Sequence, residues 1–338
     1  MNKRIDSTTK KIKTKYKIVI TGHGYKNLDI EKNILSKINA GVIDADKMYK
    51  KKLIQIIKDA DGLIVGDTDV NKELISRMEK CKVISEYGIG VDNIDIGTAT
   101  ENEIVVANVP GYGTEEVANQ AFALLMALAR KICMLNNLTK VKGWSYARES
   151  VKPIFRLKNK VLGVIGCGRI GQAFSERAKP FGFKILVNDP YQNRDDLEKK
   201  GYIIATVERI IKESDFISIH CPLTEETNRL FDESKFKLMK RTAYLINVAR
   251  GAIIDENALL KALKEKWIAG AGLDVLSDYE LRSDNPLFNY FINNDNLLIV
   301  PHTAWYSEES EIELRTRASK AVVSVLSGEE PESKVNEV

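Results

Sequence analysis

Short β-branched runs alternate with amphipathic stretches along most of this chain, and no other feature limits its fold as strongly. In the first part, residues 29–38, 50–60 and 71–80 carry apolar side chains at helical spacing. The β-branched runs that flank them are 17–21 (KIVIT), 63–65, 82–85 (KVIS) and 104–107 (IVVA). Short strands that alternate with helices are typical of βαβ units, whose strands lie parallel in one sheet.

The same rhythm starts afresh after Lys160. The second set of runs is 161–166 (VLGVIG), 184–188 (KILVN), 216–220 (FISIH), 244–248 (YLINV), 272–275 (GLDV) and 296–300 (NLLIV). Helical stretches such as 257–266 lie between these runs. Two sets of this kind predict an α/β protein with two doubly wound parallel-sheet domains.

Two helical segments lie at the borders of the second set. Residues 114–135 begin with a threonine cap and early acids and continue as a long apolar face. They predict a helix of about 30 Å, at 1.5 Å per residue, which could cross between two lobes. The residues after Glu308 again have a helical pattern and could pack back on the first lobe.

A glycine-rich turn follows the first strand of the second set. Gly166, Gly168 and Gly171 form GCGRIG, which precedes a predicted helix over about 169–181, and Asp189 ends the next strand eighteen residues after Gly171. In this context the first glycine allows the tight turn, the second lets a pyrophosphate approach the backbone, and the third lets helix pack on strand. The helix N-terminus attracts the anion.

This turn indicates a dinucleotide cofactor. Asp189 can accept hydrogen bonds from a ribose 2′-hydroxyl and would repel a 2′-phosphate, so NAD is favoured over NADP. A turn without ligand, or another adenosine cofactor such as S-adenosylmethionine, remains an alternative. Because the turn begins about 160 residues into the chain, we expect an NAD-binding domain over 109–302 that is inserted in a substrate domain made of 17–108 and 303–338.

Several motifs further along, taken with the glycine turn, resemble the D-isomer-specific 2-hydroxyacid dehydrogenase family. The resemblance runs from about Lys17 to the end of the chain. Its motifs are 87–95 (YGIGVDNID), 108–110 (NVP), 220–224 (HCPLT), 247–251 (NVARG), 272–275 (GLDV), 301–305 (PHTAW) and 335–336 (VN). The stretch 301–309 (PHTAWYSEE) is most similar to the branch that contains C-terminal-binding proteins and hydroxypyruvate or glycerate dehydrogenases. The resemblance implies a Rossmann domain inserted in a flavodoxin-like domain.

The resemblance implies an enzyme that interconverts a small D-2-hydroxy acid and its 2-oxo acid. Arg250 ends a strand, and its guanidinium suits a carboxylate and can polarise the adjacent carbonyl. His302 also ends a strand and can hold and release a proton near neutral pH. The backbone N–H groups of Ile89 and Gly90 can hold the substrate carboxylate.

A carboxylate that supports the histidine is the third expected catalytic group. In the family it lies five residues after the aspartate of the GLDV motif, which here would be Tyr279. A one-residue insertion in this loop would place Glu280 in the role. Asp278 is the second candidate, and loss of the relay is the third reading.

The resemblance also implies a set of cofactor contacts. Asp274 and the 248–250 backbone would position the nicotinamide end. The expected NAD-binding residues are Gly166, Gly168, Arg169, Ile170, Gly171, Asp189, Cys221, Pro222, Thr227, Val248, Ala249, Arg250, Asp274 and His302. Of the other histidines, His220 is expected to be structural, and His23, in a glycine-rich turn, could face the cleft.

The substrate-side loops lack positive charge. Gly66-Asp67-Thr68 follows one strand and Glu86 precedes Tyr87, so no Arg or Lys stands there for a phosphate. We therefore favour a small unphosphorylated acid, such as glycerate or hydroxypyruvate, over 3-phosphoglycerate. A phosphoglycerate dehydrogenase remains an alternative. So does an NAD(H)-sensing binding protein of the C-terminal-binding-protein type with little turnover, which the loop insertion would favour.

The charge of the chain lies in its first residues. Residues 1–17 carry seven basic side chains and one acid, so a net charge of +4 for the whole chain leaves −2 for residues 18–338. We expect residues 1–16 to be a disordered basic tail. A nucleic-acid-binding domain would need a basic face, and the composition of the remaining chain does not indicate one. The sequence contains no run of 18 or more apolar residues, so no membrane-spanning helix is predicted.

The remaining expectations concern location and assembly. The first seventeen residues lack the apolar core of a secretory signal, which favours a cytoplasmic protein. The four cysteines are far apart, which predicts neither a disulfide framework nor a metal site. Members of the family pair through the dinucleotide domain, and the apolar helix at 114–135 has more surface than one lobe would cover. A homodimer through the NAD-binding domain is therefore expected.

Overall fold

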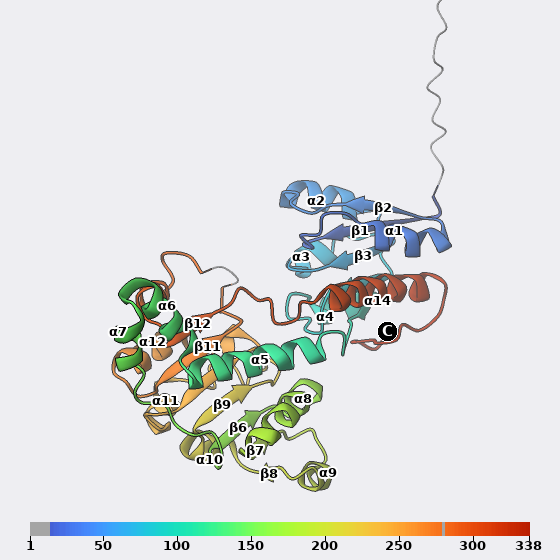
Figure 1. The fold of residues 1–338 in the computed structure, drawn as a ribbon. Coiled ribbons are helices and arrows are strands. Elements are labelled where there is room, and N and C mark those ends of the chain that lie inside the picture. Colours follow the sequence, from blue (N-terminus) through green and yellow to red (C-terminus); the bar gives the residue numbers. More distant parts are fainter. Residues whose placement is uncertain (1–13, 279–280) are drawn as a thin grey trace, which may run out of the picture. The chain divides into compact units, whose positions relative to one another are not determined.

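The computed structural model describes residues 14–278 and 281–338, which form two compact units (Figure 1). Unit 1 consists of the described residues up to Tyr112 together with Glu308–Val338, and unit 2 is Gly113–Ser307. Unit 2 is thus inserted in the sequence of unit 1. The sequence-based boundaries lay a few residues earlier, at 108 and 302.

Unit 1 is built on a five-stranded parallel sheet. Its strands are β1 (Tyr16–Thr21), β2 (Ala40–Asp44), β3 (Gly62–Val65), β4 (Val83–Glu86) and β5 (Val105–Ala107). They lie in the order β2-β1-β3-β4-β5, and every neighbouring pair is parallel. This is the strand order of flavodoxin-like doubly wound folds. Strand β2 is added on one side of β1, and β3, β4 and β5 are added on the other side.

Helices from both ends of the chain cover this sheet. They are α1 (Asp29–Leu35), η1 (Ser36–Ile38), α2 (Lys50–Ile57), α3 (Lys72–Ile75), α4 (Ile96–Glu101) and α14 (Glu308–Leu326). The helix α14 packs against α1 and against strands β3, β4 and β5. The Ser85 hydroxyl donates to the carbonyl of Ala318 in α14 at 2.9 Å. The last residues therefore complete a unit that the first residues begin.

Unit 2 is built on a seven-stranded parallel sheet. Its strands are β6 (Val161–Ile165), β7 (Lys184–Asn188), β8 (Ile203–Ile204), β9 (Phe216–Ile219), β10 (Tyr244–Asn247), β11 (Gly270–Leu273) and β12 (Leu297–Ile299). They lie in the order β12-β11-β10-β9-β6-β7-β8. Counted from β8, the first six strands lie in the order of a Rossmann fold, and β12 adds a seventh strand at the opposite edge.

Helices lie on both faces of the unit 2 sheet. They are α5 (Thr114–Ala129), α6 (Ile132–Lys142), α7 (Trp144–Glu149), α8 (Arg169–Ala178), η2 (Lys179–Phe181), α9 (Arg194–Lys199), α10 (Val207–Glu213), α11 (Glu233–Leu238), η3 (Gly251–Ile253), α12 (Glu256–Lys264) and α13 (Phe288–Asn293). The buried side chains of α5 and α8 form one core with the sheet, and those of α10, α11 and α12 form another. The predicted fold class, with two doubly wound parallel-sheet domains, is confirmed.

The prediction of one long helix over 114–135 was wrong. The helix α5 ends at Ala129, and α6 starts at Ile132 at an angle of 53° to it. Lys131 between them takes a left-handed conformation, with φ of 54°, which ends helical hydrogen bonding at this point. Both helices belong to unit 2.

Within the described ranges, no single helix is long and apolar enough to span a membrane. The bent pair α5 and α6 has the length and composition of a membrane span, on those two criteria only. Most of the apolar face of α5 lies in the core of unit 2.

Candidate active site

The glycine turn after β6 has two glycines that close packing requires and one that faces open space. A Cβ on Gly166, whose φ is +86°, would lie 2.4 Å from the Cys221 nitrogen. A Cβ on Gly171 would lie 2.1 Å from the Gly166 carbonyl oxygen. A Cβ on Gly168 would meet no heavy atom within 4 Å. The turn therefore keeps an open cradle at its middle glycine, where the backbone of a Rossmann domain approaches a pyrophosphate.

The helix α8 starts directly after this cradle. It begins at Arg169 and Ile170, and Gly168 is its N-cap residue without a side-chain cap. The N–H groups of a first helical turn have no partner within the helix and carry the positive end of its dipole. The predicted residues 166–171 thus form a site suited to an anion.

Asp189 follows β7 and contacts the same turn. Its carboxylate accepts hydrogen bonds from the N–H groups of Cys167 at 2.7 Å and of Tyr191 at 3.0 Å. Cys167 is the second residue of the glycine turn, so the negative charge is held beside the cradle. Its oxygens retain capacity for ribose hydroxyls, whereas a 2′-phosphate would face like charge.

A second part of the site follows β9. Cys221 and Val248 are buried, and the loop after Cys221 is held by Thr227. The Thr227 hydroxyl donates to the carbonyl of Pro222 at 2.7 Å and accepts from the Thr224 N–H. The predicted cofactor residues of this loop therefore have a fixed backbone.

The turn that carries Arg250 is fixed by a residue that the sequence analysis missed. Asn247, the last residue of β10, is fully buried. Its amide nitrogen donates to the Arg250 carbonyl at 2.9 Å, and its oxygen accepts from the Ala249 N–H at 3.0 Å. The Arg250 Nη1 donates to the Ala249 carbonyl at 2.8 Å. A buried asparagine at a strand end was the signal for this role.

The turn that carries His302 is held in the same way by Asp274. The Asp274 carboxylate accepts hydrogen bonds from the N–H groups of Thr303 and Ala304, both at 3.0 Å. The His302 N–H donates to the Asp274 carbonyl at 2.9 Å, and the φ of His302 is +51°. Burial raises the pKa of Asp274, whereas these two N–H groups and the charge of His302 oppose the rise.

These residues lie at one edge of one sheet. The glycine turn follows β6, Arg250 follows β10, Asp274 follows β11 and His302 follows β12. All these strands are parallel, so their carboxyl ends share an edge, and this edge is where open α/β sheets bind ligands. Unit 2 thus brings an anion cradle, a guanidinium and an imidazole to the same edge.

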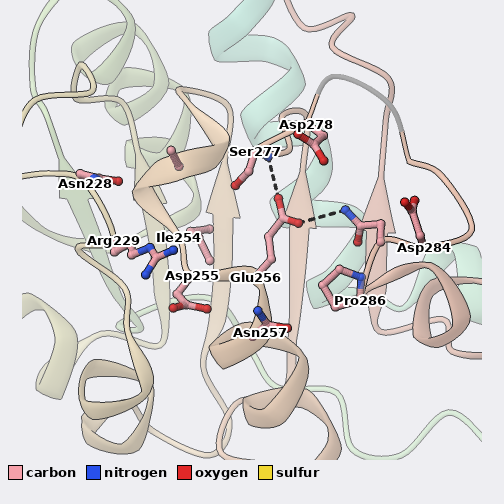
Figure 2. Close-up of a pocket in the computed structure, with 12 residues that line it drawn as sticks. Asn228, Arg229, Ile254, Asp255, Glu256, Asn257, Ser277, Asp278, Asp284 and Pro286 are labelled. Atoms are coloured by element: carbon pink, nitrogen blue, oxygen red, sulfur yellow. Dashed lines mark hydrogen bonds between the residues drawn. The ribbon is translucent and has the colours of Figure 1, made fainter.

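Of the two carboxylates predicted to support His302, the structure describes only Asp278. Glu280 lies outside the described residues. The Asp278 side chain is 72% exposed, and its carboxylate lies 3.7 Å from the Arg282 guanidinium. Asp278 lines a cavity of about 580 Å³ together with Arg229, Glu256 and Asp284 (Figure 2). Arg250 and His302 do not line this cavity, so we do not assign the reaction to it.

The other two histidines are held by hydrogen bonds. The His220 Nε2 is 2.8 Å from the Ser218 hydroxyl, and burial lowers the pKa of His220 to about 3. It therefore stays neutral, and its ring centre lies 5.0 Å from that of Phe174. The His23 Nδ1 accepts from the Tyr25 N–H at 2.8 Å, and its Nε2 lies 3.1 Å from Asp44. With 1% of its side chain exposed, His23 is a structural part of unit 1.

The predicted substrate residues of unit 1 lie in the loop after β4. The carbonyl of Gly88 accepts from the Val109 N–H at 2.8 Å, and the carbonyl of Ile89 accepts from the Asn108 amide at 2.7 Å. Among the described residues, the N–H groups of Ile89 and Gly90 have no acceptor. This loop therefore presents two adjacent free donors.

The fold and the unit 2 site define a Rossmann-type dinucleotide-binding oxidoreductase. The NAD-binding domain model of the D-isomer-specific 2-hydroxyacid dehydrogenases matches residues 122–304. A glyoxylate reductase of Korarchaeum cryptofilum is 39% identical to this chain over 85% of it and 86% of the relative. The chain belongs to the D-isomer-specific 2-hydroxyacid dehydrogenase family and is an NAD-dependent oxidoreductase.

Two further relatives show the range of the similarity. A D-3-phosphoglycerate dehydrogenase of Methanocaldococcus jannaschii is 40% identical over 86% of this chain but only 55% of its own length. A D-lactate dehydrogenase of Aquifex aeolicus, solved with NAD and lactic acid, is 29% identical. Its TM-score is 0.84, over 92% of this chain and 96% of that one.

Proposed function

We propose that this enzyme reduces a small unphosphorylated 2-oxo acid to its D-2-hydroxy acid with NADH. The observation that carries this proposal is the shared sheet edge of the glycine turn, Arg250 and His302. In the reaction a hydride adds to the carbonyl carbon, a proton adds to the carbonyl oxygen, and NAD⁺ is released. The reverse reaction oxidises the hydroxy acid.

Each of the two catalytic side chains has one role in this proposal. The Arg250 guanidinium donates hydrogen bonds to the substrate carboxylate and polarises the neighbouring carbonyl. His302 donates its proton to the developing alkoxide and takes it back in oxidation. NADH, when bound along residues 166–171 and Asp189, supplies the hydride. Asn247 and Asp274 hold the two turns that carry these groups.

The loop after β4 is proposed to donate hydrogen bonds to the substrate carboxylate. The free N–H groups of Ile89 and Gly90 are adjacent and suit an anion. We also propose that Glu280 supports His302, as the family pattern with a one-residue insertion implies.

The charge of the unit 1 loops sets the substrate class that we propose. The segments 66–71 and 86–95 contain no Arg or Lys, and they carry Asp67 and Glu86. A phosphate dianion would find no cation in these loops, which favours acids of the size of glyoxylate or hydroxypyruvate over 3-phosphoglycerate. The name of the Korarchaeum relative, glyoxylate reductase, supports a small substrate.

We further propose a homodimer that forms through unit 2. The helix α6 has no buried residue, although it contains Ile132 and Val141. Val141 and Trp144 have 75% and 77% of their surface exposed. Exposed apolar side chains gathered on two consecutive helices favour a protein partner. A monomer mass at micromolar concentration in analytical ultracentrifugation would refute this assembly.

The test of the enzymatic proposal is turnover with a panel of acids. NADH oxidation is followed with glyoxylate, hydroxypyruvate, pyruvate and 3-phosphohydroxypyruvate for wild type and for His302→Ala. We expect wild type to turn over the small acids and the variant to lose about 10²- to 10⁴-fold of kcat. No turnover above the variant with any acid would refute the proposal. NADH binding without turnover would instead favour the NAD(H)-sensing class.

A further inference from the structure

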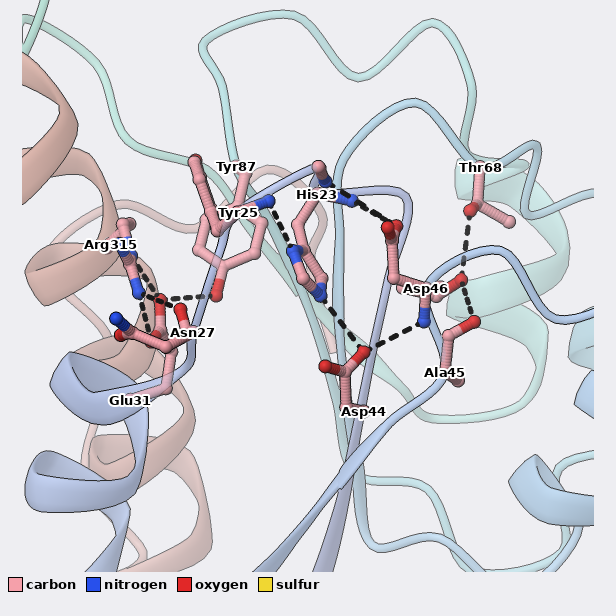
Figure 3. A network of polar contacts seen from close by, with 12 residues as sticks. His23, Tyr25, Asn27, Glu31, Asp44, Ala45, Asp46, Thr68, Tyr87 and Arg315 are labelled. Carbon is pink, nitrogen blue, oxygen red and sulfur yellow. Dashed lines mark hydrogen bonds and ion pairs between the residues drawn. The ribbon is translucent and has the colours of Figure 1, made fainter.

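A buried ion pair in unit 1 contacts Tyr87, the first residue of the proposed carboxylate loop 87–90 (Figure 3). Glu31 in α1 is 0% exposed and Arg315 in α14 is 6% exposed. The Arg315 Nε and Nη2 atoms donate to the two carboxylate oxygens of Glu31 at 2.7 and 2.9 Å. This fork fixes the orientation of the carboxylate, and not only its distance.

Tyr87 joins this pair to the loop. It is buried directly before Gly88, and its hydroxyl donates to Glu31 Oε1 at 2.9 Å. Burial and the charge of Glu31 raise the pKa of Tyr87 well above its usual value, so the hydroxyl keeps its proton. The direction of the Tyr87 side chain is therefore set by an oriented carboxylate.

The same guanidinium also holds the turn after β1. Arg315 Nη2 donates to the Asn27 carbonyl at 2.7 Å, and the guanidinium lies 4.3 Å from the centre of the Tyr25 ring. Tyr25 packs edge-on against Tyr87, at 5.4 Å, and stacks on His23. Thus one cation from the last helix supports two loops at the carboxyl edge of the sheet.

Stability alone is a poor explanation of this arrangement. Removing two charges from water costs about as much as their attraction returns, so apolar side chains would stabilise the same place equally well. An ion pair with a bidentate geometry instead selects one position of the groups that it contacts. The group nearest to the proposed chemistry is Tyr87.

We propose that Tyr87, Glu31 and Arg315 act as a positioning trio for the substrate carboxylate. The trio anchors one end of the loop 87–90, and the hydrogen bonds from Asn108 and Val109 hold its carbonyls. Together they hold the backbone that carries the N–H groups of Ile89 and Gly90. This inference rests on the proposed function, because it assigns the loop to substrate binding.

The variant Tyr87→Phe tests the trio, because it removes one oxygen atom and leaves the Glu31–Arg315 pair intact. We expect the KM for glyoxylate to rise about tenfold, the effect of one lost hydrogen bond to a charged group. The kcat should stay within about threefold and the Kd for NADH should not change. Arg315→Lys keeps the charge without the fork and should raise KM in the same direction.

The matched control is Tyr16→Phe. The Tyr16 hydroxyl also donates to α14, to the Leu326 carbonyl at 2.9 Å, but Tyr16 is at the start of β1. Thermal unfolding of both variants monitors the fold. An unchanged KM in Tyr87→Phe, or an equal rise in Tyr16→Phe, would overturn the positioning role. Absence of turnover in wild type would instead mean that the proposed function has failed, and the inference with it.

Discussion

Replacing Gly168 with alanine separates the folding role of the glycine turn from its ligand role. Gly168 has φ of −73°, which alanine adopts readily, and its added Cβ would meet no heavy atom within 4 Å. The unliganded variant should therefore unfold with the same free energy as wild type, or about 0.4–1 kcal/mol more, because alanine restricts the unfolded chain. The folded structure gives no reason for a loss.

Binding of NADH should respond in the opposite way. The new methyl group would occupy the space through which the pyrophosphate approaches the backbone, and overpacking of one methyl costs typically 1–3 kcal/mol. At about 2 kcal/mol, the Kd for NADH would rise about 30-fold. The assay pairs urea unfolding of the unliganded protein with a titration of NADH fluorescence.

The control variant is Gly171→Ala. Its Cβ would lie 2.1 Å from the Gly166 carbonyl oxygen, so the backbone must shift and both stability and NADH affinity should fall. If Gly168→Ala bound NADH within about threefold of wild type, the pyrophosphate would not lie at this glycine, and the assignment of the cradle would be refuted.

Three further results are expected. Arg250→Lys keeps the positive charge but loses the two-pronged geometry of the guanidinium. We expect kcat/KM to fall about a hundredfold, the equivalent of ~3 kcal/mol of charge-assisted hydrogen bonding. Unchanged kinetics would exclude Arg250 from substrate binding. Asp189→Ser removes like charge beside a 2′-phosphate, and the ratio of the Kd values for NADPH and NADH should fall about fivefold or more; a constant ratio would contradict the role of Asp189. His220 has a pKa of about 3 in the folded chain, so the unfolded chain takes up its proton first as pH falls below about 6.5. Between pH 6.5 and 4.5, the free energy of unfolding of wild type should fall by about 2–3 kcal/mol more than that of His220→Gln. Parallel curves of stability against pH would show that His220 does not cause the loss in wild type.

Strands buried on both faces were predictable because their β-branched runs leave few other conformations. The run KIVIT became β1, and FISIH contains β9, in which all four residues are buried. The strand β2 (AGVID) was missed, since it starts with Ala40-Gly41 and is only partly buried at the edge of its sheet. The break between α5 and α6 was also hidden, because Arg130 and Lys131 are good helix formers and only the left-handed backbone of Lys131 ends the helix.

The site was predictable to the level of strand ends. The motifs placed Arg250, Asp274 and His302 after three strands, and parallel pairing brought them to one edge. The position of Asn247 and Asp274 at strand ends was visible in the sequence, but the backbone groups that their side chains bind were not, because those groups are set by the shape of each turn. The ion pair of Glu31 and Arg315 joins residues 284 positions apart, and neither residue belongs to a motif.

The split sequence of unit 1 has a consequence for biosynthesis. Unit 2 is one continuous segment, so its whole sequence has been made once the ribosome has passed Ser307. Unit 1 has to wait, because α14 and the last residues belong to it. Asn336 accepts from the Val106 N–H at 2.8 Å and donates to the Ile104 carbonyl at 2.9 Å, which closes the edge of β5. The N-terminal strands are therefore made first but complete their unit last, contrary to the usual order in which N-terminal domains fold first during synthesis. Until α14 has been made, β4 and β5 lack the helix that packs against them, and the apolar side chains that it covers stay exposed.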